Sequence, residues 1–182
     1  MIQIKAIEIK NIRGIRNLSL TLDNKSFAIH GPNGTGKSGV VDAIDFALTG
    51  KIKRLSGEGM NEIPLAKYGP HIDALETPEL ASVELKAFLT GLEIEATITR
   101  DFKNLSRPKY EPNTAAVKEE FEKIAAHPEI ALSRRQIMRF IIATAKKRSD
   151  QIEELLQLKK VKNARAALKT AFNTAKLSLI HI

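Results

Sequence analysis

The chain has 182 residues and a formal net charge of +8, with no cysteine, no tryptophan and 5% aromatic residues. This length is sufficient for one domain with a substantial core. The absence of cysteine excludes a disulfide scaffold, a cysteine-ligated zinc site and thiol catalysis. The sequence contains no run of 18 apolar residues and no signal-peptide core, so we expect a cytoplasmic protein that does not associate with a membrane.

The positive charge is confined to the C-terminal part of the chain. Residues 1–100 carry 12 basic and 12 acidic side chains, whereas residues 101–182 carry 17 and 9. Residues 134–176 alone hold 12 basic and 3 acidic side chains. Such a block indicates an acidic partner, with nucleic acid as the first candidate, although a solvated basic helix face would give the same pattern.

The N-terminal residues are predicted to form strands. Apolar and polar residues alternate over residues 2–9, with a change of phase near Ala6, and alternate again over residues 18–22. Residues 11–14 contain a glycine and are typical of a turn between the two strands. Residues 27–30 form a short apolar run, which predicts a strand covered on both faces.

A phosphate-binding motif follows this run. Residues 31–38 match G-x-x-x-x-G-K-[ST], and apolar residues at helical spacing continue from there to Gly50. In this pattern the glycines let backbone N–H groups face a phosphate, and the helix N-terminus adds partial positive charge. Lys37 can reach the β- and γ-phosphates of ATP, and the Ser38 hydroxyl can ligate Mg²⁺. The predicted ATP-binding residues are Gly31, Pro32, Asn33, Gly34, Thr35, Gly36, Lys37 and Ser38, unless the motif is only a glycine-rich turn between a strand and a helix.

The rest of the chain is predicted to contain one hairpin and a helical C-terminal part. Residues 51–79 show no sustained period, and residues 83–99 alternate as two strands joined by a two-residue turn at Thr90–Gly91. Residues 103–114 are predicted to be a loop, and a first helix is expected from residue 115 to 126.

Two further helices are expected. A capping box, Ser133 with Gln136, predicts the start of the second helix. The third is expected to begin near Ser149, and its apolar stripe up to Leu179 is compatible with the root of a coiled coil.

Three segments together resemble the N-terminal lobe of the SMC-type ATPases. They are Ile-Glu-Ile-Lys-Asn-Ile-Arg-Gly-Ile, Gly-Pro-Asn-Gly-Thr-Gly-Lys-Ser, and Val-Val-Asp-Ala-Ile-Asp-Phe-Ala-Leu-Thr-Gly. That class includes the SbcC, RecN and RecF groups and related AAA-type proteins of bacterial DNA repair and defence. The resemblance implies an α/β fold, a P-loop NTPase head lobe of the ABC/SMC type. It implies a mixed sheet around the P-loop helix and an antiparallel hairpin layer in residues 1–148, and a projecting helical arm in residues 149–182.

The resemblance also implies roles for two residues outside the loop. In such heads two ATP molecules are sandwiched between two copies, Arg13 would approach the nucleotide, and Gln136 would contact Mg²⁺ and the attacking water. Lys37 and Gln136 would then be the catalytic residues, with Ser38 and Gln136 at the metal. Two alternatives remain open, since Arg13 could be a turn residue in solvent and Gln136 only the capping partner of Ser133.

An acidic Mg²⁺ ligand at the end of an apolar strand is not found after Ser38. Residues 55–59 resemble the ABC signature motif, but they lie directly after the P-loop helix, and we interpret this as coincidence. We therefore expect half of a head, from a truncated or split protein or a fragment, that binds ATP weakly and hydrolyses it slowly or not at all. Its expected partners are a C-terminal lobe, a second head and DNA, with a nuclease as a further candidate.

Two other functions are compatible with the sequence. One is a non-enzymatic module that binds nucleic acid or a protein partner through the basic helices of residues 134–176. The other is a different P-loop class, a kinase or a GTPase, which the predicted hairpin and long basic helix disfavour.

Overall fold

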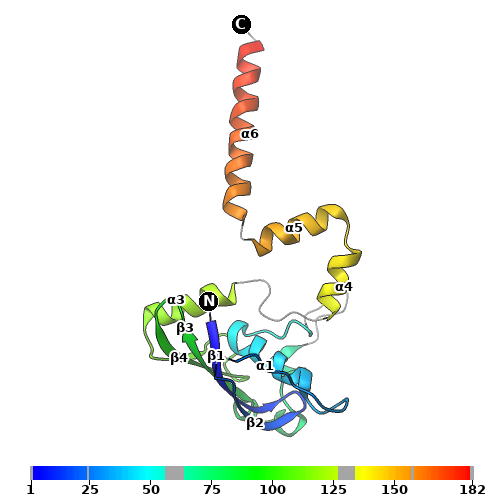
Figure 1. Cartoon of the computed structure of the whole chain (residues 1–182), viewed down its shortest axis with the longest axis vertical. Helices are drawn as coiled ribbons and strands as arrows, with labels where there is room; N and C mark the ends of the chain where they lie inside the picture. Colours follow the sequence, from blue (N-terminus) through cyan, green and yellow to red (C-terminus); the bar gives the residue numbers. More distant parts are fainter. Residues whose placement is uncertain (1, 24, 56–63, 127–133, 157, 181–182) are drawn as a thin grey trace. The chain divides into compact units, whose positions relative to one another are not determined.

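The computed structural model describes residues 2–23, 25–55, 64–126, 134–156 and 158–180. The chain divides into two compact units, Met1–Ala131 and Leu132–Ile182 (Figure 1). The first unit contains a sheet with helices on it, and the described residues of the second form helices and short connections.

The sheet of the first unit has five strands in the order β2-β1-β3-β4-β5, and every pair is antiparallel. The expectation of a mixed sheet with a separate hairpin layer was therefore wrong for the described strands. The two predicted hairpins share one sheet because β1 pairs with β3 from Ile2 to Lys10. The strands are β1 (Ile2–Ile12), β2 (Ile15–Thr21), β3 (Ser82–Leu89), β4 (Ile94–Asp101) and β5 (Lys109–Glu111).

The change of phase predicted in the first strand is confirmed. The register of β1 against β3 shifts between Ile4 and Ala6, as at a β-bulge. The extra residue lets Ile7 and Ile9 enter the core, where they are 1% and 0% exposed.

The turn of the second hairpin is longer than predicted. Leu89 pairs with Ile94, so four residues, 90–93, connect β3 to β4 instead of two. Leu92 continues the apolar alternation in the sequence but lies in the turn, where its N–H donates to the Leu89 carbonyl at 3.1 Å. Glu93 adopts a φ of 54°, which reverses the chain without a glycine at that position.

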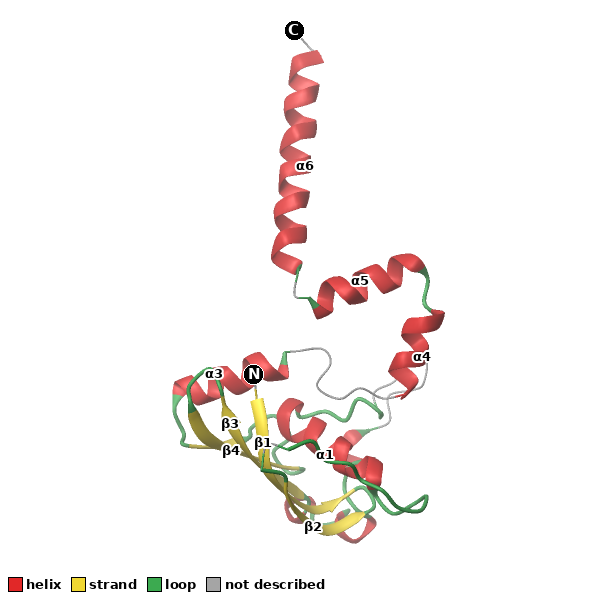
Figure 2. Ribbon diagram, in the orientation of Figure 1, coloured by secondary structure: helices red, strands yellow, loops and turns green. Residues whose placement is uncertain are grey.

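Helices α1 (Lys37–Thr49) and α3 (Ala115–Ala125) complete the core of this unit. Helix α1 packs on β1, β3 and β4 and also contacts α3 (Figure 2). At the centre, Phe46 of α1 is fully buried and stacks on Phe102 with 4.2 Å between the ring centroids. Apart from the buried Arg100, the charged side chains of β1, β3 and β4 alternate with buried residues along the strands, and Lys5 pairs with Glu95 across strands, so a solvated face is confirmed.

Two other sequence predictions fail in the first unit. Residues 25–32 form no strand, and Phe27 and Ile29 are 55% and 40% exposed. An isolated strand is not stable without a neighbour, and no described strand pairs with this segment. The predicted loop at residues 103–114 contains the edge strand β5, which is too short to show a period.

The segment predicted to be irregular, residues 51–79, contains only short helical turns among its described residues. It holds α2 (Leu65–Tyr68) and the 3₁₀ turns η1 (Ile72–Ala74) and η2 (Pro78–Leu80). Residues 56–59, which complete the resemblance to a signature motif, lie outside the described residues.

The second unit consists of α4 (Arg134–Ile142), α5 (Ala145–Leu155) and α6 (Lys159–Ile180). The single helix expected from Ser149 is therefore two helices. The predicted apolar stripe of α6 is exposed, with Val161, Leu168 and Phe172 at 62%, 72% and 67%. The boundary expected at residue 148, and the coiled-coil root beyond it, stay predictions. None of the helices in the described ranges is long and apolar enough to cross a membrane.

The stacked pair in the core should dominate the stability of the first unit. We expect Phe46→Ala to lower the free energy of unfolding by about 3–5 kcal/mol, because it leaves a cavity beside Phe102. Urea denaturation of the chain measures this change. Phe27→Ala, at an exposed position, is the control and should change stability by less than about 0.5 kcal/mol. Equal losses in the two variants would contradict the burial of Phe46 in the core.

Candidate functional site

The predicted phosphate loop precedes α1 directly. Gly34 and Gly36 have φ values of 87° and 84°, a region that residues with a side chain adopt only with strain. Gly36 is the residue before the first turn of α1, and its carbonyl accepts hydrogen bonds from the N–H groups of Gly39 and Val40. The two glycines therefore produce the tight reversal that brings the loop to the N-terminus of a 13-residue helix.

The lysine of the motif folds back over its own loop. The Lys37 ammonium donates to the carbonyl oxygen of Gly31 at 2.7 Å and also to that of Pro32. The Thr35 hydroxyl donates to the same Pro32 carbonyl at 2.9 Å. The positive charge thus lies in the concavity of the loop, and phosphate oxygens would replace neutral carbonyls as its partners. Ser38 is exposed in the first turn of α1.

The turn between β1 and β2, with Ile15 at the start of β2, packs against the start of α1. A Cβ atom placed on Gly36 would lie 3.0 Å from Cγ1 of Ile15, and one placed on Gly39 would lie 3.1 Å from Cδ1 of Ile15. Ile15 itself is 7% exposed. A side chain at Gly36 or Gly39 would therefore force Ile15 to move, and the contact holds the start of α1 against the first hairpin.

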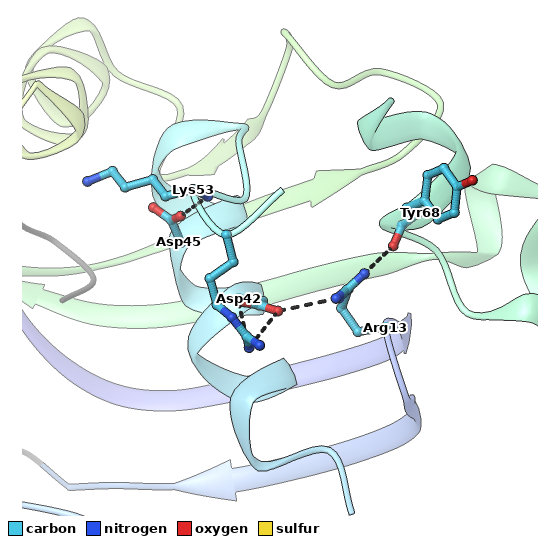
Figure 3. A network of polar contacts seen from close by, with 6 residues as sticks. Arg13, Asp42, Asp45, Lys53 and Tyr68 are labelled. Carbon is cyan, nitrogen blue, oxygen red and sulfur yellow. Dashed lines mark hydrogen bonds and ion pairs between the residues drawn. The ribbon is translucent and has the colours of Figure 1, made fainter. Parts of the chain in front are cut away.

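Arg13 belongs to the same turn and does not point into solvent. It has a φ of 54°, and its guanidinium lies 3.4 Å from the carboxylate of Asp42 and donates to the Tyr68 carbonyl at 2.7 Å (Figure 3). Arg54 pairs with Asp42 as well, at 3.4 Å. Asp42 is 3% exposed and lies one helical turn after Ser38, so both arginines are held close to the phosphate loop.

A second buried carboxylate on α1 anchors the chain after the helix. Asp45 is 2% exposed and accepts the backbone N–H of Lys53 at 2.7 Å (Figure 3). It also contacts the Thr49 hydroxyl at 3.4 Å. Burial raises the pKa of Asp45, and the Lys53 N–H partly offsets that effect. Burial likewise raises the pKa of Asp42, against the opposing charges of Arg54 and Arg13.

The loop can hold phosphate groups, and it offers little to a metal ion by itself. Ser38 supplies one hydroxyl near the loop, whereas Asp42 and Asp45 are engaged by basic and backbone groups. Within the described ranges there is no group of three or more His, Asp or Glu side chains that could hold a metal ion. Gln136 lies in α4, but its side chain and all of Ser133 fall outside what the structure describes.

Comparison with known proteins identifies the family of the chain. The AAA domain family matches residues 6–179, which is nearly the whole chain. The chain belongs to the AAA domain family. The chromosome partition protein Smc of Methanocaldococcus jannaschii is 48% identical over 48 residues, which cover 26% of this chain and 4% of that protein. The Smc protein of Methanococcus voltae is 37% identical over 78 residues, or 42% of this chain and 6% of that protein.

These matches confirm the resemblance drawn from the three motif segments. The chain is an N-terminal lobe of an SMC-type P-loop ATPase within the AAA domain family. The matched segments span only a small fraction of the length of the Smc relatives.

Sequence reasoning missed the pair of buried carboxylates on the P-loop helix. Asp42 and Asp45 are three residues apart and therefore share a helix face, and Lys51, Lys53 and Arg54 follow shortly after the helix. This sequence pattern predicts that the carboxylates of α1 form ion pairs with the segment that follows the helix. It gives no indication that Arg13 from the first hairpin also pairs with Asp42.

The buried carboxylates should leave a pH signature. Their pKa values are raised in the folded chain, so their contribution to stability is full below 3.8, the usual value, and is lost as pH rises through the folded-state values. We therefore expect the melting temperature of the wild type, relative to that of the Asp42→Asn/Asp45→Asn variant, to increase as pH is lowered from neutral toward 3.8. A difference that stays constant or decreases over this range would contradict the raised pKa values.

Proposed function

We propose that this chain binds ATP as the N-terminal half of an SMC-type ATPase head. The observation that carries the proposal is the loop of residues 31–38, with its two left-handed glycines, its inward lysine and a helix N-terminus behind it. These groups form an anion-binding concavity of the kind that holds the phosphates of a nucleotide. Membership of the AAA domain family supports the same ligand.

We further propose that a second lobe completes the site. Phe27 and Ile29 are exposed immediately before the loop, in a segment whose composition is that of a buried strand. A strand from a C-terminal lobe could pair with this segment and cover both side chains. Such a lobe would also supply the acidic metal ligand and the signature motif, without which most of the transition-state stabilisation is missing.

Arg13 and Gln136 are proposed to act at the nucleotide once the head is assembled. The Cβ of Arg13 lies 3.6 Å from the position of a Cβ on Gly39, so its side chain starts beside the first turn of α1. A rotation away from Asp42 would direct the guanidinium toward phosphate. Mg²⁺, when bound with ATP, would neutralise phosphate charge, and Ser38 and Gln136 are the residues proposed to hold it.

The proposed setting is a dimer of heads that acts on DNA. The two relatives are named as chromosome partition proteins. By analogy we propose that ATP binding brings two heads together, with one ATP on the loop of each, and that this cycle drives DNA binding or processing in repair or defence. A nuclease is a candidate partner in that setting.

ATP binding by the chain can be tested by thermal unfolding. ATP with Mg²⁺ at ten times its dissociation constant should raise the melting temperature by about 3 °C, since ligand binding stabilises only the folded chain. Lys37→Ala should abolish the shift, because Lys37 is the charge inside the loop. Lys86→Ala, on the solvated face of the sheet, is the matched control and should retain the shift.

Further readouts separate binding from catalysis. Arg13→Ala should reduce the shift without abolishing it. Phosphate release from ATP by the isolated chain should equal that of Lys37→Ala. A wild-type chain with no shift, or a Lys37→Ala variant with the full shift, would refute the proposed site.

A second candidate function, a nucleic-acid-binding module, is favoured by the cations of the second unit. Lys146, Lys147, Arg165 and Lys169 are exposed, and none of them forms an ion pair within the described residues. Two other basic residues of this unit have structural partners. Arg148 donates to the carbonyls of Ile141 and Ala143, and Lys162 pairs with Asp150 and Glu153.

This candidate predicts a steep dependence of DNA affinity on salt. The affinity for duplex DNA should fall linearly on a log–log plot against salt concentration, and Lys146→Ala/Lys147→Ala should reduce the slope by about 2, near 0.9 for each lost phosphate contact. Fluorescence anisotropy with a labelled duplex measures both. Lys67→Ala/Lys86→Ala removes the same charge from the first unit and should leave the slope unchanged. Undetectable affinity at low salt would exclude the module.

A further inference from the structure

The first unit contains a cavity that the nucleotide site does not use. It has a volume of about 610 Å³ and lies where the C-terminal end of α1, residues 105–108, β5 and α3 meet. Cavities of this size are typical of sites for small ligands. Its apolar wall includes the rings of Tyr110 and Phe121, whose centroids are 5.6 Å apart.

A buried arginine lines this cavity. Arg100 of β4 is 7% exposed, and its Nε donates to the Ala47 carbonyl at 3.2 Å while its Nη1 donates to the Leu105 carbonyl. No carboxylate forms an ion pair with Arg100 in the part of the chain that the structure describes. A buried guanidinium without a counter-charge is costly, and it keeps its charge because arginine does not lose its proton in proteins.

The two carbonyl contacts explain only part of the arrangement. Ala47 is in the last turn of α1, so Arg100 satisfies a carbonyl that the helix leaves without a partner. Two carbonyls occupy two of the five N–H donors of a guanidinium.

The rim of the cavity adds positive charge. Lys51, Arg107 and Lys118 line it, and Glu122 is the one acidic residue among the lining residues. Glu122 lies 3.9 Å from Lys118, a long and exposed pair. Neither Lys51 nor Arg107 forms a side-chain ion pair with any residue in the described ranges. Three cations and one acid therefore line the cavity together with the buried Arg100.

We propose that this cavity is a second anion site that binds the phosphate group of a phosphorylated ligand. It lies at the opposite end of α1 from the phosphate loop, about 20 Å away for a helix of 13 residues. Arg100 and the rim cations hold the phosphate, and the rings of Tyr110 and Phe121 contact the organic part of the ligand. The site is distinct from the ATP site and does not depend on it.

Tyrosine fluorescence gives a direct test, because the chain has no tryptophan and its two tyrosines are Tyr68 and Tyr110. In a Tyr68→Phe/Lys37→Ala background, Tyr110 is the remaining fluorophore and the phosphate loop is disabled. Inorganic phosphate, titrated against sodium chloride of equal ionic strength, should change this signal saturably with a dissociation constant on the order of 1 mM. Lys51→Ala/Arg107→Ala should weaken binding at least tenfold. Lys103→Ala/Lys109→Ala removes the same charge from exposed positions outside the cavity and should change affinity less than twofold.

Two further probes identify the source of the phosphate. If ribose 5-phosphate reproduces the signal while anisotropy of a labelled oligothymidylate is unaffected by Lys51→Ala/Arg107→Ala, the ligand is a small phosphorylated molecule. If inorganic phosphate displaces the oligonucleotide and the same variant loses it, the phosphate belongs to a nucleic-acid strand. The absence of a saturable signal, or equal weakening in the two double variants, would overturn the proposal. Because every arm contains Lys37→Ala, this failure is independent of ATP binding at the loop.

Discussion

Helix α1 occupies its position because no side chain separates its first turn from Ile15. Gly36 and Gly39 both face this residue at distances that leave no room for a Cβ atom without movement. The contact joins the phosphate loop to the first hairpin, and Arg13 in the adjacent turn reaches Asp42 on the same helix. The geometry of the candidate nucleotide site thus depends on the close approach of the β1–β2 turn to the start of α1. Further along the same helix, Phe46 is buried against the sheet.

The features that sequence predicted correctly are those with a local cause. The tight turn before α1 follows from glycines at fixed spacing in residues 31–38, and the bulge in β1 follows from a change of phase at Ala6 that can be read within a few residues. The buried face of the β3–β4 hairpin follows from the same alternation. Here each residue's neighbours in the chain determine its environment, so a single sequence is sufficient.

The features that sequence missed depend on partners distant in the chain. The apolar run at Phe27 and Ile29 predicts a strand, but strand formation requires a neighbour, which no described segment provides. The alternation of apolar residues could not give the length of the turn after Leu89. Leu92 continues the apolar pattern although it lies in the turn and not in β4. Arg100 is bonded by carbonyls of other elements, and Arg13 reaches Asp42 from the first hairpin; local periodicity carries no information about either contact.

The pairing of β1 with β3 has a consequence for the synthesis of this protein. Ile2 pairs with Leu89 and Lys10 with Ser82, so the first strand leaves the ribosome long before its central neighbour exists. Helix α1 is made in between, and Phe46 meets its partner Phe102 only after β4 is complete. Until then the part of α1 that packs on β3 and β4 is uncovered, which is the condition under which nascent chains aggregate or engage chaperones. The helix behind the phosphate loop is therefore translated early, and its burial is completed only late.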